Sequence, residues 1–492
     1  MKRLLLLPLA LLCALPAAAA AQAGSCVLVE NRFVNRQDMG GGYVVLSVAG
    51  PLRVECDGGT TLRADSATVY SASNEVQLFG NVDYRDPTRT LTSNYATYSS
   101  AMGRLYATGN VVFTDVTRGS TLRGPELEYF RAMQGRPQPQ VNAGQRPHLT
   151  IVPSGSAENR EPLQVDGDRI TSVGENFFSA SGNVVIHRSD LDATAAEATH
   201  DGAAQTLNLR GNARIRGERF DLIGETVDAT LPQNRLERVV ARRDAELVSD
   251  RLRVDGPEIH LFFQDDLLQR LVTRGPAGAG AGEGAQARPL VAATGLLLEA
   301  DSVEAVLPGQ VLERVYAVGR AHAETVDTAG RPPAPTGPRA RLAKQERPGE
   351  PGVTRDRDWV LGDTIVGYFV RKDSAAAPRP VSADSLAPED EVELERVVTT
   401  GSARAFYRVR DENDRVGEVP AMNYLVAREI ELTMEDGAME VAEARGLQRG
   451  VYLDPAAPGT AAPAPAQGGP EATPQTPPAQ TPPPPASPGR SR

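Results

Sequence analysis

The sequence has few of the residues that build thick hydrophobic cores or catalytic centres. Aromatic residues make up 5% of its 492 residues, and it has one tryptophan, three cysteines and five histidines. Its apolar residues come in thin alternating runs, which suit an extended β structure better than a single thick core. The net charge of −11 also argues against nucleic acid as a main partner.

The chain has only one long apolar run, at its start. Two basic residues, Lys2 and Arg3, precede the apolar residues 4–15, and small residues around Ala23 form a cleavage site. This pattern predicts a secretory signal peptide over residues 1–23. No later run is long enough for a membrane-spanning helix, so we expect an exported, periplasmic protein, with membrane association only through a lipid anchor.

Two cysteines, Cys26 and Cys56, remain once Cys13 is removed with the signal peptide. In an oxidising compartment they are expected to form a disulfide, the alternative being two unpaired thiols. Closing a loop of about 30 residues would contribute roughly 3–4 kcal/mol to stability. A lipoprotein anchor on Cys26 is a third alternative, disfavoured because Ala23 stands where such anchors prefer leucine.

No residue pattern typical of catalysis or metal binding is present. The five histidines lack the paired spacing of metal ligands, and neither a nucleophile elbow nor a phosphate-binding P-loop occurs. The glycine-rich run 278–284 lacks the strand and helix of a nucleotide site, and residues 166–168 lack the other ligands of a calcium loop. We therefore expect a non-enzymatic protein without a metal or cofactor.

The sequence does contain a repeated β pattern. Residues 62–70 (L-R-A-D-S-A-T-V-Y) and 76–84 (V-Q-L-F-G-N-V-D-Y) recur as 91–98 and 105–113, and the glycines are 109 − 80 = 29 positions apart. Both halves alternate apolar and polar residues and are bounded by turn residues, as β-strands are. A repeat of this length is typical of solenoid-like stacks.

Residues with the parity of the repeated glycine are expected to face inward. The segment 76–84 has one apolar and one polar face, and the glycine at its middle marks a place for a sharp bend. The phrase recurs around Gly182 and Gly211, and in a degenerate copy Arg243 occupies the glycine position. The inward residues that we take as a candidate groove are Leu78, Val82, Tyr84, Leu105, Val111, Phe113, Phe178, Val184, Ile186, Leu207, Leu209 and Ile215.

The repeats predict an all-β fold, an elongated β-jelly-roll built as a solenoid-like stack of antiparallel rungs with inserted loops. The tail has almost no large apolar residue, so it cannot offset its ordering entropy and is expected to be disordered. From the N-terminus, the chain divides into a signal peptide (1–23), well-matched repeats (24–133), a loop (134–162), a second set of repeats (163–274), a linker (275–289), degenerate repeats (290–453) with disordered insertions (328–357 and 373–389), and a Pro/Ala-rich tail (454–492).

The repeat resembles the OstA-like domain of the lipopolysaccharide-transport family, which includes LptA, LptC and the N-terminal domain of LptD. The resemblance rests on the motif L-x-A-D-x-A-x-x-Y followed by G-N-V, at 62–70 with 80–82, at 91–98 with 109–111, and at 182–184. It implies a β-jelly-roll of V-shaped rungs, a β-taco, whose apolar interior holds the acyl chains of lipopolysaccharide. It also implies joining to other Lpt-type envelope proteins through paired edge strands.

This resemblance leads us to expect an LptA-like periplasmic bridge that carries lipopolysaccharide or a related amphiphile toward the outer membrane. One acyl chain of about a dozen methylenes costs on the order of 10 kcal/mol to expose to water, so a lipid carrier needs a continuous apolar trough. The alternative is a non-catalytic scaffolding β-solenoid of the cell envelope that binds protein partners. Any narrow solenoid needs inward apolar residues for its own core.

The two ends of the stack differ in sequence. Residues 44–54 alternate without a proline before Pro51, and we expect them to form an N-terminal edge that docks a partner strand or a second copy. Residues 438–453 carry several charged side chains just before the tail. We expect this C-terminal edge to be blunted.

Overall fold

The computed structural model describes residues 26–56, 59–99, 101–152, 162–249, 252–275, 288–293, 295–325, 358–371, 392–409, 421–435 and 438–453. The predicted signal peptide, with its predicted cleavage site at Ala23, and the predicted tail 454–492 lie outside the described residues. The insertion 373–389 and nearly all of the linker 275–289 also lie outside them, as does 328–357.

The described chain is all-β, and its strands form one hydrogen-bonded network, as the repeat predicts. Two short 3₁₀ turns, η2 (Pro232–Asn234) and η3 (Pro308–Gln310), are its only helical segments among these residues. The strands are β1 (Cys26–Glu30), β2 (Phe33–Asp38), β3 (Val44–Cys56), β4 (Thr60–Tyr70), β5 (Glu75–Arg85), β6 (Arg89–Ser99), β7 (Arg104–Asp115), β8 (Thr121–Phe130), β9 (Gln140–Gly144), β10 (His148–Ile151), β11 (Leu163–Asp166), β12 (Arg169–Val173), β13 (Phe177–Arg188), β14 (Leu191–Asp201), β15 (Thr206–Gly217), β16 (Phe220–Thr230), β17 (Arg238–Ser249), β18 (Leu252–Gln264), β19 (Leu267–Arg274), β20 (Leu290–Ala293), β21 (Leu296–Glu299), β22 (Ser302–Val306), β23 (Arg314–Thr325), β24 (Trp359–Arg371), β25 (Val392–Val409), β26 (Ala421–Glu435), β27 (Ala438–Arg445) and β28 (Arg449–Leu453).

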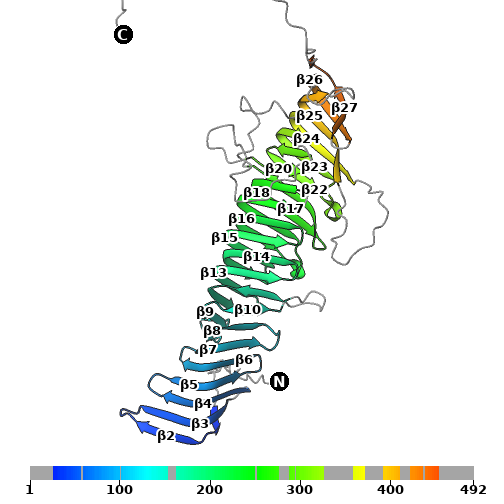
Figure 1. Ribbon diagram of the computed structural model, residues 1–492. Helices are drawn as coiled ribbons and strands as arrows, with labels where there is room; N and C mark the ends of the chain where they lie inside the picture. The colour runs from blue at the N-terminus through cyan, green and yellow to red at the C-terminus, as the bar shows by residue number, and fades with distance from the viewer. Residues whose placement is uncertain are drawn as a thin grey trace, which may run out of the picture.

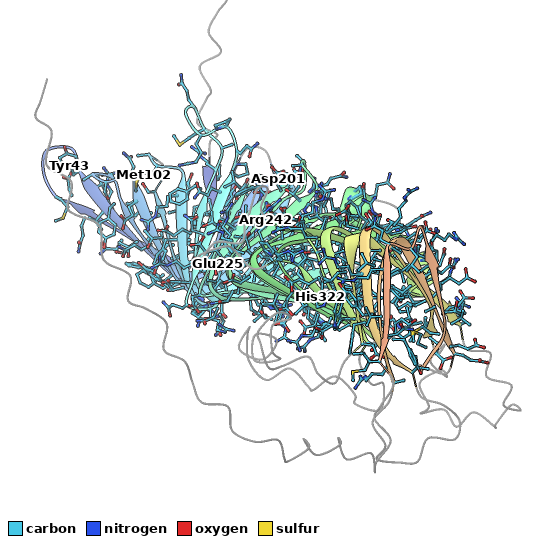
Figure 2. The ribbon with its side chains drawn as sticks, turned by 90° about the horizontal axis from the view of Figure 1, so that it is seen from above. Tyr43, Met102, Asp201, Glu225, Arg242 and His322 are labelled. Atoms are coloured by element: carbon cyan, nitrogen blue, oxygen red, sulfur yellow. The ribbon has the colours of Figure 1, made fainter. Side chains whose placement is uncertain are left out.

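Successive strands pair antiparallel and lie across the long axis of an elongated body (Figure 1). The stack runs from β2 and β3 at one end to β26 and β27 at the other. In Figure 2, Tyr43, Met102 and Asp201 follow one another along one side of this body. Each strand contacts mainly its two neighbours, which is the one-dimensional architecture of repeat proteins.

A bend at the middle of the long strands explains the Gly-Asn motif. At Gly80-Asn81 both residues have positive φ, 72° and 43°, and the β4–β5 register shifts at this point. Gly182-Asn183 repeats this conformation, with φ of 75° and 47°. Glycine adopts positive φ without a steric cost and asparagine tolerates it better than most residues. We call this line of bends the corner of the stack.

The A-D half of the motif completes the corner from the preceding strand. Asn81 donates a hydrogen bond from Nδ2 to Asp65 Oδ2 (2.9 Å), and Asn183 donates one to Asp168 Oδ2 (3.1 Å). Asp168, which the sequence placed in an incomplete calcium-like loop, is therefore a corner residue. In the degenerate copy Arg243 holds the glycine position at a φ of 58°.

The strand ends form two rows of turns on either side of the corner. Because the strands run alternately in opposite directions, every second turn lies in the same row. Lip A comprises the turns at 71–74, 101–103, 131–139, 174–176, 202–205, 231–237, 265–266 and 307–313. Lip B comprises the turns at 86–88, 116–120, 189–190 and 218–219.

The stretch predicted as a loop, 134–162, contains two strands, so this prediction was wrong over β9 and β10. β9 pairs with β8 and β12, and β10 pairs with β8 and β11, so the two form one rung broken at the corner. Each piece is only four or five residues long. The intervening Gln145-Arg146-Pro147 interrupts the alternation that marks a strand in the sequence.

The predicted position of the N-terminal edge is also corrected. β3, which contains residues 44–54, is an internal strand, because β1 and β2 pair along one side of it and β4 along the other. β1 and β2 were missed because they are short and lack the regular alternation of apolar and polar residues: β1 is almost wholly apolar, and β2 changes from apolar to polar after Val34. At the other end, β27 and β28 pair only with β26 among the described strands, as expected for a terminal rung.

The register of β1 and β3 places Cys26 directly opposite Cys56. Opposite residues of an antiparallel pair have Cα atoms roughly 4.5–5.5 Å apart, which lies within the range that a disulfide requires. We expect the exported protein to show no free thiol before reduction and two thiols after it, by intact mass with a thiol label. Labelling of both cysteines without reductant would contradict the pairing, and diacylglycerol on Cys26 would identify a lipoprotein.

Candidate functional site

The candidate groove residues do lie on the inward face of the bend. All of them are buried except Tyr84, which is partly buried and packs against the core. Most, such as Leu209 and Ile215, belong to the continuous hydrophobic core of the stack. Of the twelve named from the sequence, Phe113 and Phe178 line chamber 1, the cavity described below, and none of the other ten lines it or chamber 2. The interior is therefore a filled core interrupted by cavities.

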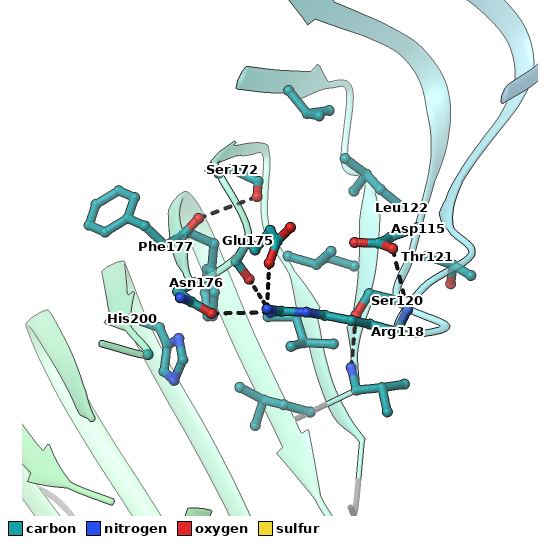
Figure 3. A pocket seen from close by; sticks show the side chains of 18 of the residues that line it. Asp115, Arg118, Ser120, Thr121, Leu122, Ser172, Glu175, Asn176, Phe177 and His200 are labelled. Carbon is teal, nitrogen blue, oxygen red and sulfur yellow. Dashed lines mark hydrogen bonds and ion pairs between the residues drawn. The ribbon is translucent and has the colours of Figure 1, made fainter. Parts of the chain in front are cut away.

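One cavity, chamber 1, lies between the lips and is lined by residues from Arg89 on β6 to Asn234, which follows β16. It has a volume of about 230 Å³. Its walls combine apolar core residues with polar turn residues of both lips, from Asp115 and Ser120 on lip B to Glu175 and Asn176 on lip A (Figure 3). Further apolar wall residues are Phe113, Leu122, Val141, Leu149, Ile151 and Leu163.

Arg118 spans chamber 1 from lip B to lip A (Figure 3). Its Nη1 donates to the backbone oxygen of Glu175 (2.9 Å) and to Asn176 Oδ1 (3.1 Å), and its Nη2 forms an ion pair with Glu175 Oε2 (2.5 Å). The turn that carries Arg118 is held by Asp115, whose Oδ1 accepts the backbone N–H groups of Thr117 and Arg118. Arg118 therefore joins two turns that are 57 residues apart in sequence.

An aromatic cluster lies beside chamber 1. The rings of Phe113 and Tyr129 are 5.5 Å apart, and Arg89 Nη1 donates to Tyr129 Oη at 2.8 Å. Burial raises the pKa of Tyr129, and the nearby Arg89 charge opposes that rise. Tyr84 donates a hydrogen bond to Asp86 Oδ2 (2.9 Å), and burial is the main cause of its raised pKa. Both phenols are therefore neutral at physiological pH.

His200 is the only histidine that lines chamber 1. Its ring stacks on Phe178 with centroids 5.2 Å apart. Burial lowers the pKa of His200 despite the neighbouring Asp201 charge, so the neutral ring forms part of the wall at neutral pH.

Chamber 2 is a second cavity between the lips, farther along the stack at β14–β19. It has a volume of about 220 Å³ and shares no wall residue with chamber 1. Its apolar walls include Leu191 and Phe220 near lip B and Phe263 and Leu268 near lip A. Arg219 of lip B donates to Gln310 Oε1 of lip A (3.2 Å). Both chambers thus lie beneath an arginine that connects the lips.

Within the described ranges, no group of histidine, cysteine and carboxylate side chains is arranged to hold a metal ion. None of the described segments is a helix of the length and apolarity that crossing a membrane requires. Comparison with known proteins yields no matching family model and no matching curated protein. The site must therefore be interpreted from its own geometry.

Apart from Phe113 and Phe178, sequence reasoning missed the residues that line the chambers. The groove was assigned from the strands that carry the repeated glycine, whereas Leu122, Leu149 and Phe263 lie on strands without it. Their own alternation of apolar residues could have identified them as inward. Nothing in the local sequence indicates that Arg118 crosses to lip A.

Proposed function

We propose that the protein is a non-catalytic periplasmic carrier of acyl-chain amphiphiles, an LptA-like bridge for lipopolysaccharide or a related lipid. The observation that carries this proposal is the pair of chambers between the lips, in which apolar core residues form the inner walls and polar turn residues the rim. A dry cavity of about 150 Å³ accommodates benzene, so chambers of about 230 and 220 Å³ have room for alkyl segments. Each methylene removed from water contributes about 0.8 kcal/mol.

Each chamber has an arginine that could receive an anionic head group, beside carboxylates that line the same chamber: Asp115 and Glu175 in chamber 1, and Asp190, Glu218 and Asp266 in chamber 2. Arg89 and Arg219 donate to neutral acceptors, Tyr129 and Gln310, so these contacts do not neutralise the guanidinium charges. A guanidinium at the mouth of an apolar chamber can hold a phosphate or carboxylate while the chain lies inside. An amphiphile with an anionic head group could therefore bind with its head at Arg89 or Arg219 and its chain inside the chamber.

A scaffolding role is the second candidate, and the filled interior outside the chambers favours it. Residues such as Leu209 and Ile215 are completely buried, as the core of a rigid rod requires. In this function the chambers would stay empty and the outer faces would bind protein partners.

Photo-crosslinking separates the two candidates. Benzoylphenylalanine replaces Phe113, which lines chamber 1, or Phe79, which is outward and 40% exposed, in the exported full-length protein. We expect lipid adducts, identified by mass spectrometry, at Phe113 and not at Phe79. Absence of lipid at both sites, or equal labelling, would contradict a carrier. Protein adducts at Phe79 alone would support the scaffold.

A further inference from the structure

Arg188 is an arginine at an inward position of the stack. It follows Gly182 by six positions and has the same parity as the buried Val184 and Ile186. In the next two copies of this strand, β15 and β17, the corresponding positions hold Gly217 and Ser249. The inward cation is therefore a feature of this rung and is not required by the repeat.

The contacts of Arg188 join the two lips. Its Nε and Nη2 form a bidentate pair with Asp190 (2.5 and 2.7 Å), and its Nη1 donates to the backbone oxygen of Asn234 (3.0 Å). The Arg188 side chain is 5% exposed, whereas that of Asp190 is 44% exposed. A buried guanidinium is tolerated only when its donors are satisfied, so these partners hold the side chain in one position.

This connection lies between the two chambers. On lip A, Asn234 lines chamber 1 and Leu236 lines chamber 2. On the side of lip B, Leu163 at the start of β11 lines chamber 1, while Asp190 and Leu191 line chamber 2. The Arg188–Asn234 contact therefore crosses the groove where one chamber ends and the other begins.

We propose that Arg188 is a septum that divides the groove into two chambers and thereby limits the length of the acyl segment that each accepts. This inference rests on the proposed function. A cavity of about 150 Å³ holds benzene, which has six carbons. At the same volume per carbon, each chamber holds about nine carbons, and the two chambers joined would hold about eighteen. Arg188 is thus a residue that determines chain-length specificity.

The test measures binding of saturated fatty acids of increasing length to the full-length exported protein by native mass spectrometry. Each additional buried methylene raises affinity roughly four-fold. For the wild type, affinity is expected to rise up to decanoate and then level off, with octanoate binding once per chamber. In Arg188→Gly, which installs the residue found at position 217 of the next unit, affinity should keep rising to octadecanoate, ending at least about ten-fold above the wild type.

Two controls keep the test decisive. Arg214→Ala removes an arginine that pairs with Asp221 (2.6 Å) on the outer face, and it should keep the wild-type plateau. Arg188→Ala serves as the second variant if glycine weakens the strand end, because the exposed Asp190 stays hydrated without its partner. Octanoate binding equal to that of the wild type shows that the chambers of a variant are intact.

The outcomes for the septum and for the carrier function are distinguishable. Octanoate binding with the same plateau in the wild type and both Arg188 variants would overturn the septum and leave the carrier proposal standing. A wild-type affinity that rises without a plateau to octadecanoate would also overturn it. Absence of any fatty-acid binding, together with absence of lipid adducts at Phe113, would overturn the carrier function itself and the septum with it.

Discussion

Gly182→Ala is expected to destabilise the rungs around β13 by about 3 kcal/mol. A β-carbon at this corner would lie 2.8 Å from Cβ of Asp168, and the residue has a φ of 75° that L-amino acids rarely adopt. The conformational strain accounts for about 1–2 kcal/mol and the steric overlap for the rest. Because each rung contacts mainly its neighbours, we expect amide hydrogen exchange to increase first in β12–β14.

Gly135→Ala is the matched control for this prediction. Gly135 also has a positive φ, 88°, but a β-carbon there would have no atom within 4 Å. It should lose only the strain contribution, about 1–2 kcal/mol. Asp168→Gly in the Gly182→Ala background should recover part of the loss, because glycine has no β-carbon and so removes the overlap. Equal losses for Gly182→Ala and Gly135→Ala would show that corner packing contributes nothing.

Val34→Pro is expected to abolish end-to-end association while leaving the β circular-dichroism signal nearly unchanged. No further strand pairs with β2 on its outer side in the described part of the chain. Met39 N–H donates to Tyr43 O of the neighbouring chain segment (2.9 Å). Along an antiparallel strand, successive N–H groups point alternately toward the paired strand and away from it. Val34 is five positions from Met39, so its N–H points away from β3. Proline at an outward N–H removes a docking donor without breaking the ladder.

The apolar surface of this end adds to its capacity for docking. Phe33 and Val34 are among several large apolar side chains exposed on β1 and β2. Val34→Thr is the matched control, since it keeps the backbone donor and should retain association, measured by sedimentation of the exported protein over a concentration series.

A variant at the C-terminal end of the stack tests whether that end, and not β2, is the docking surface. There, Arg445 pairs with Glu429 (2.7 Å), and charged pairs of this kind blunt an edge. If association survives Val34→Pro and is lost in Tyr452→Lys, a change in the terminal strand β28, then the C-terminal end is the docking surface.

The sequence by itself determined the strands, the repeat and the direction of the side chains. Alternation with period two is a local property, so the inward parity of Leu78, Val184 and Ile215 could be predicted from their distance to a glycine. The corner could be predicted as well, because Gly-Asn is among the few pairs that adopt consecutive positive φ angles. Where local signals were weak, as at 140–151 and in β1 and β2, the prediction failed.

Only the tertiary structure decided which inward residues form core and which form chambers. That division depends on how far the lips lie apart at each rung, which follows from the twist and bend accumulated over many strands. The twist also brings Arg118 to Glu175 and Arg188 to Asn234, pairs separated by 57 and 46 residues with no shared motif. A periodic pattern specifies the face on which a side chain lies, but contacts across the groove arise only when the whole stack has formed.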